Sequence, residues 1–451
     1  MSTLGGAVAM AQLVRDSRLG RRELDTLAAT RLKSVLINAM AVPHYAEQMR
    51  KAGFDPRRDF RSLKDLSVLP ITKKADIKAS PSSFVQAAEA GRLDRYFSDR
   101  TSGSTGIPLT VYRSPRERAF QMAKWLRVLF ASGYRPTQKV LSYTSPGRLA
   151  EGHSFIQRLG LFRRRAVDYT LPPEVLTDAL IEYQPNALYG VRTSLLSVAE
   201  ELQRRNTVCS SIDLVIAGGE VIDPQTREMC KAVFGTEITE TYGTVEMGVM
   251  AHQVKGQAEL RLIEDCTLFE FLDEQGNPAK PGEPARIVVT DLHGRLMPFI
   301  RYDQGDLVTF SVRQLESGET VRVIDRIIGR QDDVVSLPNG RSLTYLDFYE
   351  IMDVYPGVGH FRITQHSEDR FLLEVVADES YFQAITPELL SKLKALSTVT
   401  LYFDMRLVDR IAPDPSGKRR MLVSKVLRSA AGGHAYVPPT RNPRLDFASQ
   451  S

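Results

Sequence analysis

The 451-residue sequence has few cysteines and no long apolar run, and each lack excludes a class of protein. No apolar run approaches the roughly 18–20 residues that a membrane-spanning helix needs, so we expect no membrane span. No basic segment precedes the short apolar patch near the start, so we also expect no cleavable secretory signal. Only Cys209, Cys230 and Cys266 occur, without CxxC spacing, which argues against a disulfide framework. We therefore interpret the protein as cytoplasmic.

The sequence also lacks a concentrated block of positive charge. Its net charge is +5, and the densest basic cluster is the three-residue stretch Arg163–Arg165. A nucleic-acid-binding protein would concentrate basic residues on one element, so we interpret the charge as a solvated surface and expect no nucleic-acid partner. A mildly positive field also suits an enzyme that binds anionic nucleotides.

Hydrophobic periodicity predicts an α/β protein. The first 75 residues are mostly helical in pattern, and Thr72 is a candidate helix N-cap. Between about residues 100 and 300, short apolar runs alternate with helical patterns, which is typical of α/β domains that bind ligands at the carboxyl ends of strands. One helical face is predicted for Ala28, Leu32, Val35, Leu36 and Ala39. Strands are predicted in KVLSYTS, ALYGV, IDLVIAGGE, EITETYG, LFEFLD and ARIVVTDL.

The pattern changes after Gly329, where the charged connection RQDDVVSLPNGRSL leads into a smaller α/β region. Strands are predicted there in FRITQ, FLLEVVA and TLYFDMRLV, around a helix near TPELLSKLKAL. We predict a large domain over 1–330, a small domain over 331–440 and a loosely held tail over 441–451.

The loop TSGSTGIP, residues 101–108, is rich in glycine and hydroxyl groups. Gly103 and Gly106 allow backbone conformations that turn several N–H groups toward one point, and the Ser and Thr hydroxyls add donors. Such a loop suits an oligophosphate. It matches neither the GxxxxGK[ST] phosphate loop, nor the GxGxxG dinucleotide motif, nor the GxSxG nucleophile elbow. Taken alone, it is better explained by a flexible turn than by a phosphate site.

Five further motifs follow in order: AGGE (217–220), TYGTVE (241–246), PFIRYDQGD (298–306), GRQDD (329–333) and PSGKRR (415–420). Together with the loop they resemble the adenylate-forming superfamily of acyl-CoA synthetases and peptide-synthetase adenylation domains. The segment 31–77 and the stretch GSTGIPLTV are similar to phenylacetate–CoA ligase-like proteins. The resemblance runs from about residue 25 to 425. It implies a large N-terminal domain with mixed β-sheets and flanking helices, plus a small, mobile α/β C-terminal domain.

The resemblance also implies a reaction and its cofactors. A small carboxylic acid, with an aromatic acid as the expected class, would react with ATP to give an acyl-adenylate and pyrophosphate. The acyl group would then pass to the thiol of coenzyme A. Glu246 would hold Mg²⁺, since this hard cation prefers carboxylate oxygen and bridges phosphates. The β- and γ-phosphates would be wrapped by Thr101, Ser102, Gly103, Ser104, Thr105 and Gly106.

By the same resemblance, Thr241 would donate to the adenylate phosphate, and Tyr242 would pack beside adenine. Asp306 would accept both ribose hydroxyls, which suits a carboxylate with two acceptor oxygens; Arg301, five residues earlier, supports this assignment. The remaining residues implied for the adenine and acyl pockets and their surroundings are Gly218, Gly219, Glu220 and Gly243.

Three implied residues belong to the carboxy-terminal part. Arg330 would reach the ribose or the phosphate, and Asp332, next to Asp333, would be the hinge about which the small domain rotates. Lys418 would be the catalytic lysine, because an ammonium on a flexible stem can reach the α-phosphate and neutralise transition-state charge.

Several alternatives stay open at this point. The acceptor could be a carrier-protein thiol or an amine instead of coenzyme A, and a non-catalytic scaffold is a further interpretation. The joint presence of Glu246, Asp306 and Lys418 counts against a scaffold. Some members of this branch carry zinc, but Cys230, His252 and Cys266 are too loosely spaced to favour a site. Buried structural cysteines and a core or acyl-pocket role for His252 are the better interpretation, and a homodimer is the default expectation for assembly.

Overall fold

The computed structural model describes residues 3–101, 108–146, 155–209, 211–254, 256–315, 318–331, 334–412 and 420–426. The chain forms two compact units. The larger unit comprises Met1–Phe271, Ile287–Gln304 and Phe310–Arg326, and the smaller one comprises Leu272–Arg286, Gly305–Thr309 and Ile327–Ser451.

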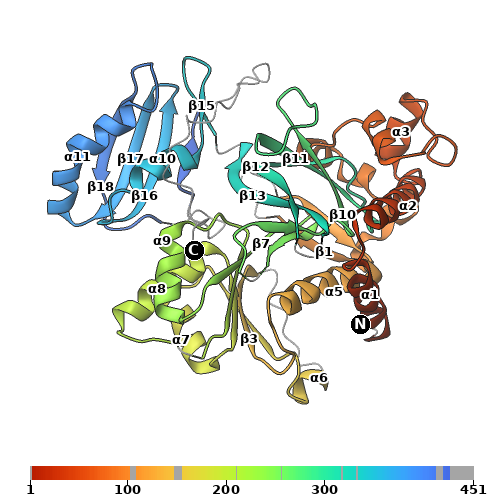
Figure 1. Cartoon of the computed structure of the whole chain (residues 1–451), viewed down its shortest axis with the longest axis horizontal. Helices are drawn as coiled ribbons and strands as arrows, with labels where there is room; N and C mark the ends of the chain where they lie inside the picture. Colours follow the sequence, from red (N-terminus) through yellow and green to blue (C-terminus); the bar gives the residue numbers. More distant parts are fainter. Residues whose placement is uncertain are drawn as a thin grey trace. The chain divides into compact units, whose positions relative to one another are not determined.

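Helices dominate the amino-terminal part of the larger unit (Figure 1). The apolar face predicted for α2 is confirmed, since Ala28, Leu32, Val35, Leu36 and Ala39 are all buried. The N-cap prediction for Thr72 is wrong. Lys73 is the N-cap of α4, while the Thr72 hydroxyl donates to the Ile300 carbonyl at 2.9 Å. The elements are α1 (Thr3–Asp16), α2 (Arg21–Ala39), α3 (Pro43–Lys51), η1 (Leu63–Val68), α4 (Lys74–Ala79), η2 (Pro81–Phe84), η3 (Ala87–Arg95) and α5 (Pro115–Ala131).

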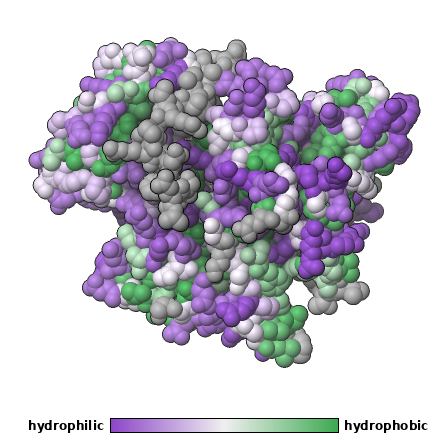
Figure 2. Space-filling model, in the orientation of Figure 1, coloured by the Kyte–Doolittle hydropathy of each residue, from purple (hydrophilic) through white to green (hydrophobic). Residues whose placement is uncertain are grey.

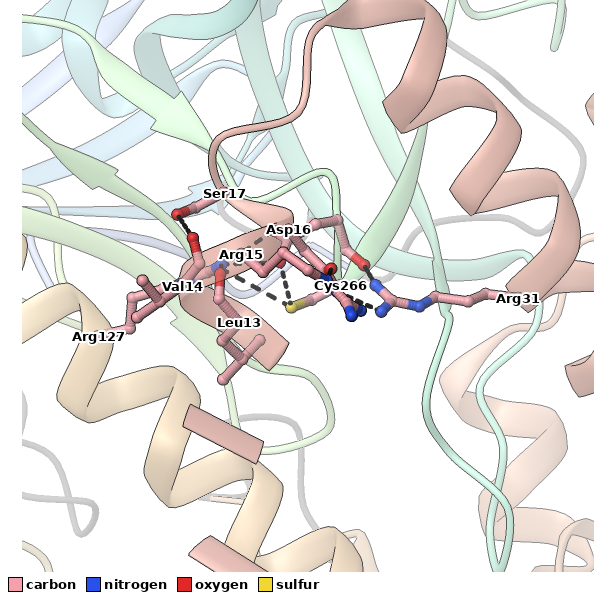
Figure 3. Close-up of polar contacts among 9 residues, drawn as sticks. Leu13, Val14, Arg15, Asp16, Ser17, Arg31, Arg127 and Cys266 are labelled. Atoms are coloured by element: carbon pink, nitrogen blue, oxygen red, sulfur yellow. Dashed lines mark hydrogen bonds and ion pairs between the residues drawn. The ribbon is translucent and has the colours of Figure 1, made fainter. Parts of the chain in front are cut away.

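Buried polar contacts anchor helix α1 to its neighbours (Figure 3). Asp16, in the last turn of α1, forms an ion pair with Arg31 of α2. Arg127 of α5 donates to the Leu13 carbonyl at 2.8 Å and forks onto the two carboxylate oxygens of Asp265 at 2.7 and 3.0 Å. These bonds satisfy charges that would otherwise be costly to bury.

Within the described residues, the central sheet has eleven strands in the order β10-β11-β12-β13-β9-β8-β7-β6-β5-β3-β4. The run from β4 to β7 is parallel, and β7, β8, β9 and β13 continue it with antiparallel pairs. The strands are β3 (Val140–Thr144), β4 (Arg164–Asp168), β5 (Ala187–Gly190), β6 (Leu214–Gly218), β7 (Ile238–Thr244), β8 (Gly248–Gln253), β9 (Leu260–Leu262), β10 (Thr267–Leu272), β11 (Pro284–Asp291), β12 (Tyr302–Gln314) and β13 (Thr320–Arg330).

Helices cover both faces of the parallel strands, as is usual for parallel sheets. Val215 and Ala217 of β6 share a hydrophobic cluster with residues of α7 (Pro173–Tyr183), α8 (Arg192–Arg204) and α9 (Pro224–Phe234). Leu214 and Ile216, which alternate with them, pack with Leu129 of α5 on the other face. The short α6 (Phe155–Arg158) lies between β3 and β4 in the chain.

The smaller unit has its own four-stranded sheet, in the order β18-β17-β16-β19. The predicted strands FRITQ, FLLEVVA and TLYFDMRLV and the predicted helix all occur there, and they share one hydrophobic cluster. The α/β fold class with mixed sheets is therefore confirmed. The elements are β14 (Val335–Ser336), β15 (Ser342–Leu343), α10 (Tyr345–Met352), β16 (Val358–Ser367), β17 (Arg370–Ala377), α11 (Glu379–Lys394), β18 (Tyr402–Leu407) and β19 (Leu422–Ser424).

The domain ranges 1–330 and 331–440 stay predictions, and the predicted tail 441–451 lies outside the described residues. No helix in the described part of the chain is both long and apolar enough to cross a bilayer. On the face shown in Figure 2, hydrophilic and hydrophobic residues are interspersed.

Candidate active site

The pairing of β6 with β7 brings two of the sequence motifs together in the larger unit. Gly218 of AGGE lies opposite Thr241 of TYGTVE in the parallel register. The Thr241 hydroxyl donates to the Ala217 carbonyl at 3.0 Å. A Cβ at position 218 would stand 2.5 Å from that hydroxyl oxygen. Glycine is required at 218 because the two motifs approach this closely.

Glycine also allows the tight turn that leads from β7 into β8. A Cβ at Gly243 would stand 2.5 Å from the Gly248 carbonyl oxygen, which is backbone and cannot move aside. Gly248 itself has a φ of +69°, and the Met247 N–H donates to the Thr244 hydroxyl at 3.2 Å. The turn places Glu246 between the carboxyl end of β7 and the start of β8.

Glu246 is buried, with 5% of its surface exposed, and two side chains from distant segments contact it. The Tyr302 hydroxyl donates to Glu246 Oε1 at 2.9 Å. The Lys74 ammonium lies 3.3 Å from the same oxygen. Since both contacts use Oε1, the carboxylate keeps Oε2 as its second acceptor.

These residues fit the Mg²⁺ role that the resemblance implies. A carboxylate oxygen is the ligand type that Mg²⁺ uses in proteins, and Glu246 presents one from a fixed turn. Among the described residues, no group of three His, Cys, Asp or Glu side chains could hold a metal ion. Such a single-carboxylate arrangement suits a cation whose other ligands are substrate phosphates and water.

Arg113 fastens this turn to the strand pair that carries the glycine- and serine-rich loop. Its guanidinium donates to the carbonyls of Val245 and Glu246, the latter at 2.9 Å. It also forms an ion pair with Asp99 at 2.8 Å, and Arg118 reaches the same carboxylate at 3.0 Å. Arg113 is 7% exposed, so its fork geometry is fixed by its surroundings.

The loop itself closes an antiparallel hairpin of β1 (Phe97–Arg100) and β2 (Thr110–Arg113). Thr101 joins the two strands at its base. Its N–H donates to the Leu109 carbonyl at 2.9 Å, and its hydroxyl accepts from the Leu109 N–H at 2.9 Å. Five of the residues predicted to wrap phosphates lie outside the described residues, namely Ser102, Gly103, Ser104, Thr105 and Gly106.

Gly219 and Glu220 of AGGE and Tyr242 of TYGTVE were also predicted to belong to the nucleotide site. Gly219 has a φ of +83°. Glu220 accepts from the Thr193 N–H at 2.7 Å and from its hydroxyl at 3.1 Å, so its carboxylate stabilises the amino-terminal end of α8. Tyr242, predicted to pack beside adenine, is buried and lies opposite Ala251 in β8. The nucleotide roles of these residues stay predictions.

In the smaller unit, two predicted nucleotide-binding residues lie together. Arg330 Nε is 3.7 Å from Asp306 Oδ1, so the guanidinium faces the carboxylate predicted to hold ribose. Gly305 has a φ of +73°, and a Cβ at this position would lie 3.4 Å from the Arg330 guanidinium. Both observations favour glycine at this position. Asp332, Asp333 and Lys418 lie outside the described residues.

Arg301 makes contacts that its motif does not reveal. Its guanidinium binds both carboxylate oxygens of Glu270, at 2.8–3.1 Å, and donates to the carbonyls of Leu69 at 2.6 Å and Ser67 at 3.3 Å. Its φ of +46° is uncommon for a residue with a side chain. Arg301 therefore ties the segment before α4 to the sheet.

The three residues considered above for a zinc site, Cys230, His252 and Cys266, have buried surroundings. Cys230 of α9 lies in the core cluster beneath the parallel strands, and burial raises the pKa of its thiol to about 12. Cys266 belongs to a different cluster, next to Arg127, and burial raises the pKa of its thiol as well. The pKa of His252 is lowered, mainly by burial. Two protonated thiols in separate clusters agree with structural roles.

Lys74, Asp99, Arg113 and Tyr302 were not predicted as site residues. Lys74 stands in ITKKAD and Tyr302 in PFIRYDQGD, two stretches of the sequence that were noted above for other reasons. Arg113 and Asp99 flank the loop by sequence, but no short-range pattern shows that Arg113 meets the turn at Glu246.

Two curated proteins and several solved structures resemble this chain. A phenylacetate–coenzyme A ligase of Thermus thermophilus is 26% identical over 387 residues, covering 83% of this chain and 86% of that protein. The Escherichia coli (strain K12) phenylacetate–coenzyme A ligase is 27% identical over 333 residues, covering 69% and 72%.

Among solved structures, a 2-hydroxyisobutyryl-CoA ligase in the postadenylation state matches with a TM-score of 0.76 and 20% identity over 90% of both chains. An anthranilate CoA ligase in complex with anthranoyl-AMP matches with a TM-score of 0.53 and 13% identity, covering 71% of this chain and 64% of that one. At these identities the likeness concerns the fold. Residues 14–293, more than half of the chain, match the AMP-binding enzymes. The resemblance read from the motifs is thereby confirmed, and the chain belongs to the AMP-binding enzyme family.

Proposed function

We propose that this protein is an acid–CoA ligase. It activates a small carboxylic acid with ATP, forming an acyl-adenylate and pyrophosphate, and then transfers the acyl group to the thiol of coenzyme A. The observation that carries the proposal is the meeting of three motif segments around Glu246: the TYGTVE turn, Tyr302 of PFIRYDQGD and the loop hairpin fastened by Arg113. Family membership and the names of the relatives support the same reaction.

The adenylation step needs hydrogen-bond donors and cations, and these residues supply them. A carboxylate must attack the α-phosphorus against charge repulsion, so the developing negative charge needs fixed donors and cations. The loop from Thr101 to Gly106 supplies backbone and hydroxyl donors for the β- and γ-phosphates. When bound at Glu246, Mg²⁺ would neutralise phosphate charge.

The other roles divide between nucleotide binding and catalysis. Asp306, with Arg330 beside it, holds the ribose. The Thr241 hydroxyl turns away from the Ala217 carbonyl, to which it donates without nucleotide, and donates to the adenylate phosphate. Lys418 neutralises charge at the α-phosphate while the acid attacks. Rotation of the small domain about Asp332 then exchanges the adenylating arrangement for the one that transfers the acyl group.

The substrate proposed is an aromatic acid. Both curated relatives are named for phenylacetate, and one solved relative is named for anthranilate, although another is named for the aliphatic 2-hydroxyisobutyrate. Coenzyme A is the proposed acceptor because all four names specify it.

The proposal is tested by incubating the purified protein with ATP, Mg²⁺, coenzyme A and one acid at a time. The panel contains phenylacetate, benzoate, anthranilate, 2-hydroxyisobutyrate and acetate, and mass spectrometry measures acyl-CoA and AMP. We expect equal amounts of acyl-CoA and AMP with an aromatic acid. Formation of ADP instead of AMP, or no acyl-CoA with any acid, would contradict the proposal. Acyl-CoA from 2-hydroxyisobutyrate alone would keep the reaction and overturn the aromatic substrate.

A further inference from the structure

Lys74 stands out because its ammonium contacts the carboxylate assigned to the metal. Its ammonium lies 3.3 Å from Glu246 Oε1, with the lysine side chain 26% exposed and the glutamate side chain 5% exposed. Within the described part of the chain, Lys74 is the one charged group in an ion pair with Glu246. The other contact to this carboxylate, from the Tyr302 hydroxyl, is neutral.

The backbone position of Lys74 is fixed by the elements around it. It is the first residue of α4, and the preceding N–H of Lys73 donates to Asp76 at 2.8 Å, which fixes the start of the helix. One residue earlier, Thr72 pairs with Tyr302 and donates its hydroxyl to the Ile300 carbonyl. The two groups that contact Glu246 are therefore held on paired backbone segments.

This placement creates a competition at one carboxylate. A buried carboxylate without a cation is costly, so the ammonium stabilises Glu246 while no metal is bound. A divalent cation on the same carboxylate would stand close to the ammonium and repel it. Free metal must displace Lys74 into solvent, whereas a metal–nucleotide complex brings phosphates to which the ammonium can turn.

We propose that Lys74 occupies the cation position at Glu246 until nucleotide arrives, so that the divalent metal binds together with ATP and not before it. The proposal deepens the proposed function, on which it rests for the assignment of the metal to Glu246. It makes Lys74 a positioning residue of the nucleotide site, with a role separate from that of Lys418.

The test measures metal binding without turnover. Mn²⁺ replaces Mg²⁺ as the probe, and electron paramagnetic resonance follows its binding to the nucleotide-free protein. Lys74→Met removes the competing charge and should tighten Mn²⁺ binding about tenfold, as expected for loss of a partly buried like charge. Lys73→Met, which removes the same charge from the exposed neighbouring position, should bind Mn²⁺ like the wild type.

Two further variants test whether the tighter Mn²⁺ binding occurs at Glu246 and provide an alternative if Lys74→Met does not fold. In Lys74→Met combined with Glu246→Gln, the tighter Mn²⁺ binding should disappear. Lys74→Gln, which keeps a polar side chain, should reproduce the effect of Lys74→Met if the latter does not fold. A nonhydrolysable ATP analogue should raise the Mn²⁺ affinity of the wild type by a larger factor than that of Lys74→Met.

An affinity within twofold of the wild type for both Lys74→Met and Lys74→Gln would overturn the proposal. So would tighter binding that persists without Glu246. Because no carboxylic acid and no turnover are involved, these outcomes are distinct from a failure to form acyl-CoA. A Lys74 effect in a protein that makes no acyl-CoA would refute the reaction and leave the metal competition standing.

Discussion

Glu246 is the buried carboxylate that Tyr302 and Lys74 both contact. Glu246→Gln keeps an oxygen that can accept from Tyr302 but removes the charge available to a metal. We expect ATP–pyrophosphate exchange to fall about 100-fold, the usual loss when one group that stabilises transition-state charge is removed. The thermal unfolding midpoint, measured alongside, should change little, because the amide preserves the shape and the Tyr302 hydrogen bond. Exchange within twofold of the wild type would refute a metal role for Glu246.

A second single residue, His293, gives a prediction of how the stability of the fold depends on pH. Its ring stacks on Phe120 with 3.9 Å between the centroids. Burial, with Arg31, Lys124 and Arg295 nearby, lowers the pKa of His293 from 6.5 to about 2. The unfolded chain therefore binds a proton below pH 6.5 that the folded chain does not bind. Stability falls as the pH drops from 6.5, by about 1.4 kcal/mol per pH unit from this residue.

The measurement is urea unfolding at pH 7 and pH 5 for the wild type and His293→Gln. The wild type should lose about 2 kcal/mol more than the variant over this interval. Loss of the stacking on Phe120 lowers the stability of the variant equally at both pH values, so it does not affect the comparison. Parallel pH profiles for the two proteins would show that His293 titrates normally.

At the scale of elements, the β1–β2 hairpin and the turn between β7 and β8 act together through Arg113. Lysine at 113 keeps the charge but cannot reach two carbonyls and Asp99 with one planar fork. We expect Arg113→Lys to raise the KM for ATP about tenfold while the KM for coenzyme A stays unchanged. Steady-state kinetics of acyl-CoA formation measure both.

Arg118 offers a matched control for this prediction. It binds the same Asp99 carboxylate at 3.0 Å and lies over the Phe97 ring, but no contact joins it to the turn at Glu246 among the described residues. Arg118→Lys should therefore keep a KM for ATP close to that of the wild type. Equal effects of the two substitutions would mean that the coupling runs through Asp99 and not through the carbonyls.

The elements also show how far sequence reasoning reaches. The short apolar runs located β6 and β7, and the shared register of these strands is what joins Gly218 to Thr241. Local patterns of this kind report the backbone directly. Thr72 shows the limit, since its N-cap chemistry was plausible locally but a tertiary bond to Ile300 prevailed. Arg301 likewise looked like support for Asp306, yet its guanidinium binds Glu270.

Two contacts at the site that the sequence did not predict share one physical feature. Lys74 and Glu246 are separated by more than 170 positions, and Arg113 precedes the two carbonyls that it binds by more than 130 positions. No periodicity or short motif reports contacts over such separations, because they depend on how whole elements pack. The motif order indicated the family, whereas the ion pairs and carbonyl contacts within the site required the three-dimensional structure.

At the scale of the whole molecule, the residues proposed for nucleotide binding are divided between two compact units. The larger unit contains Glu246, Thr241 and the strands β1 and β2, while Asp306 and Arg330 belong to the smaller one. A cytoplasmic location and a homodimer stay predictions. The adenylation step can be isolated experimentally because it needs no coenzyme A.

The most direct test of the central claim is therefore ATP–pyrophosphate exchange without coenzyme A, in the presence of Mg²⁺ and the same panel of acids. We predict exchange that depends on an aromatic acid and falls at least about 100-fold in Lys418→Ala and in Asp306→Ala. Exchange that persists in both variants would contradict the assigned site. No exchange with any acid would contradict the adenylate-forming reaction itself.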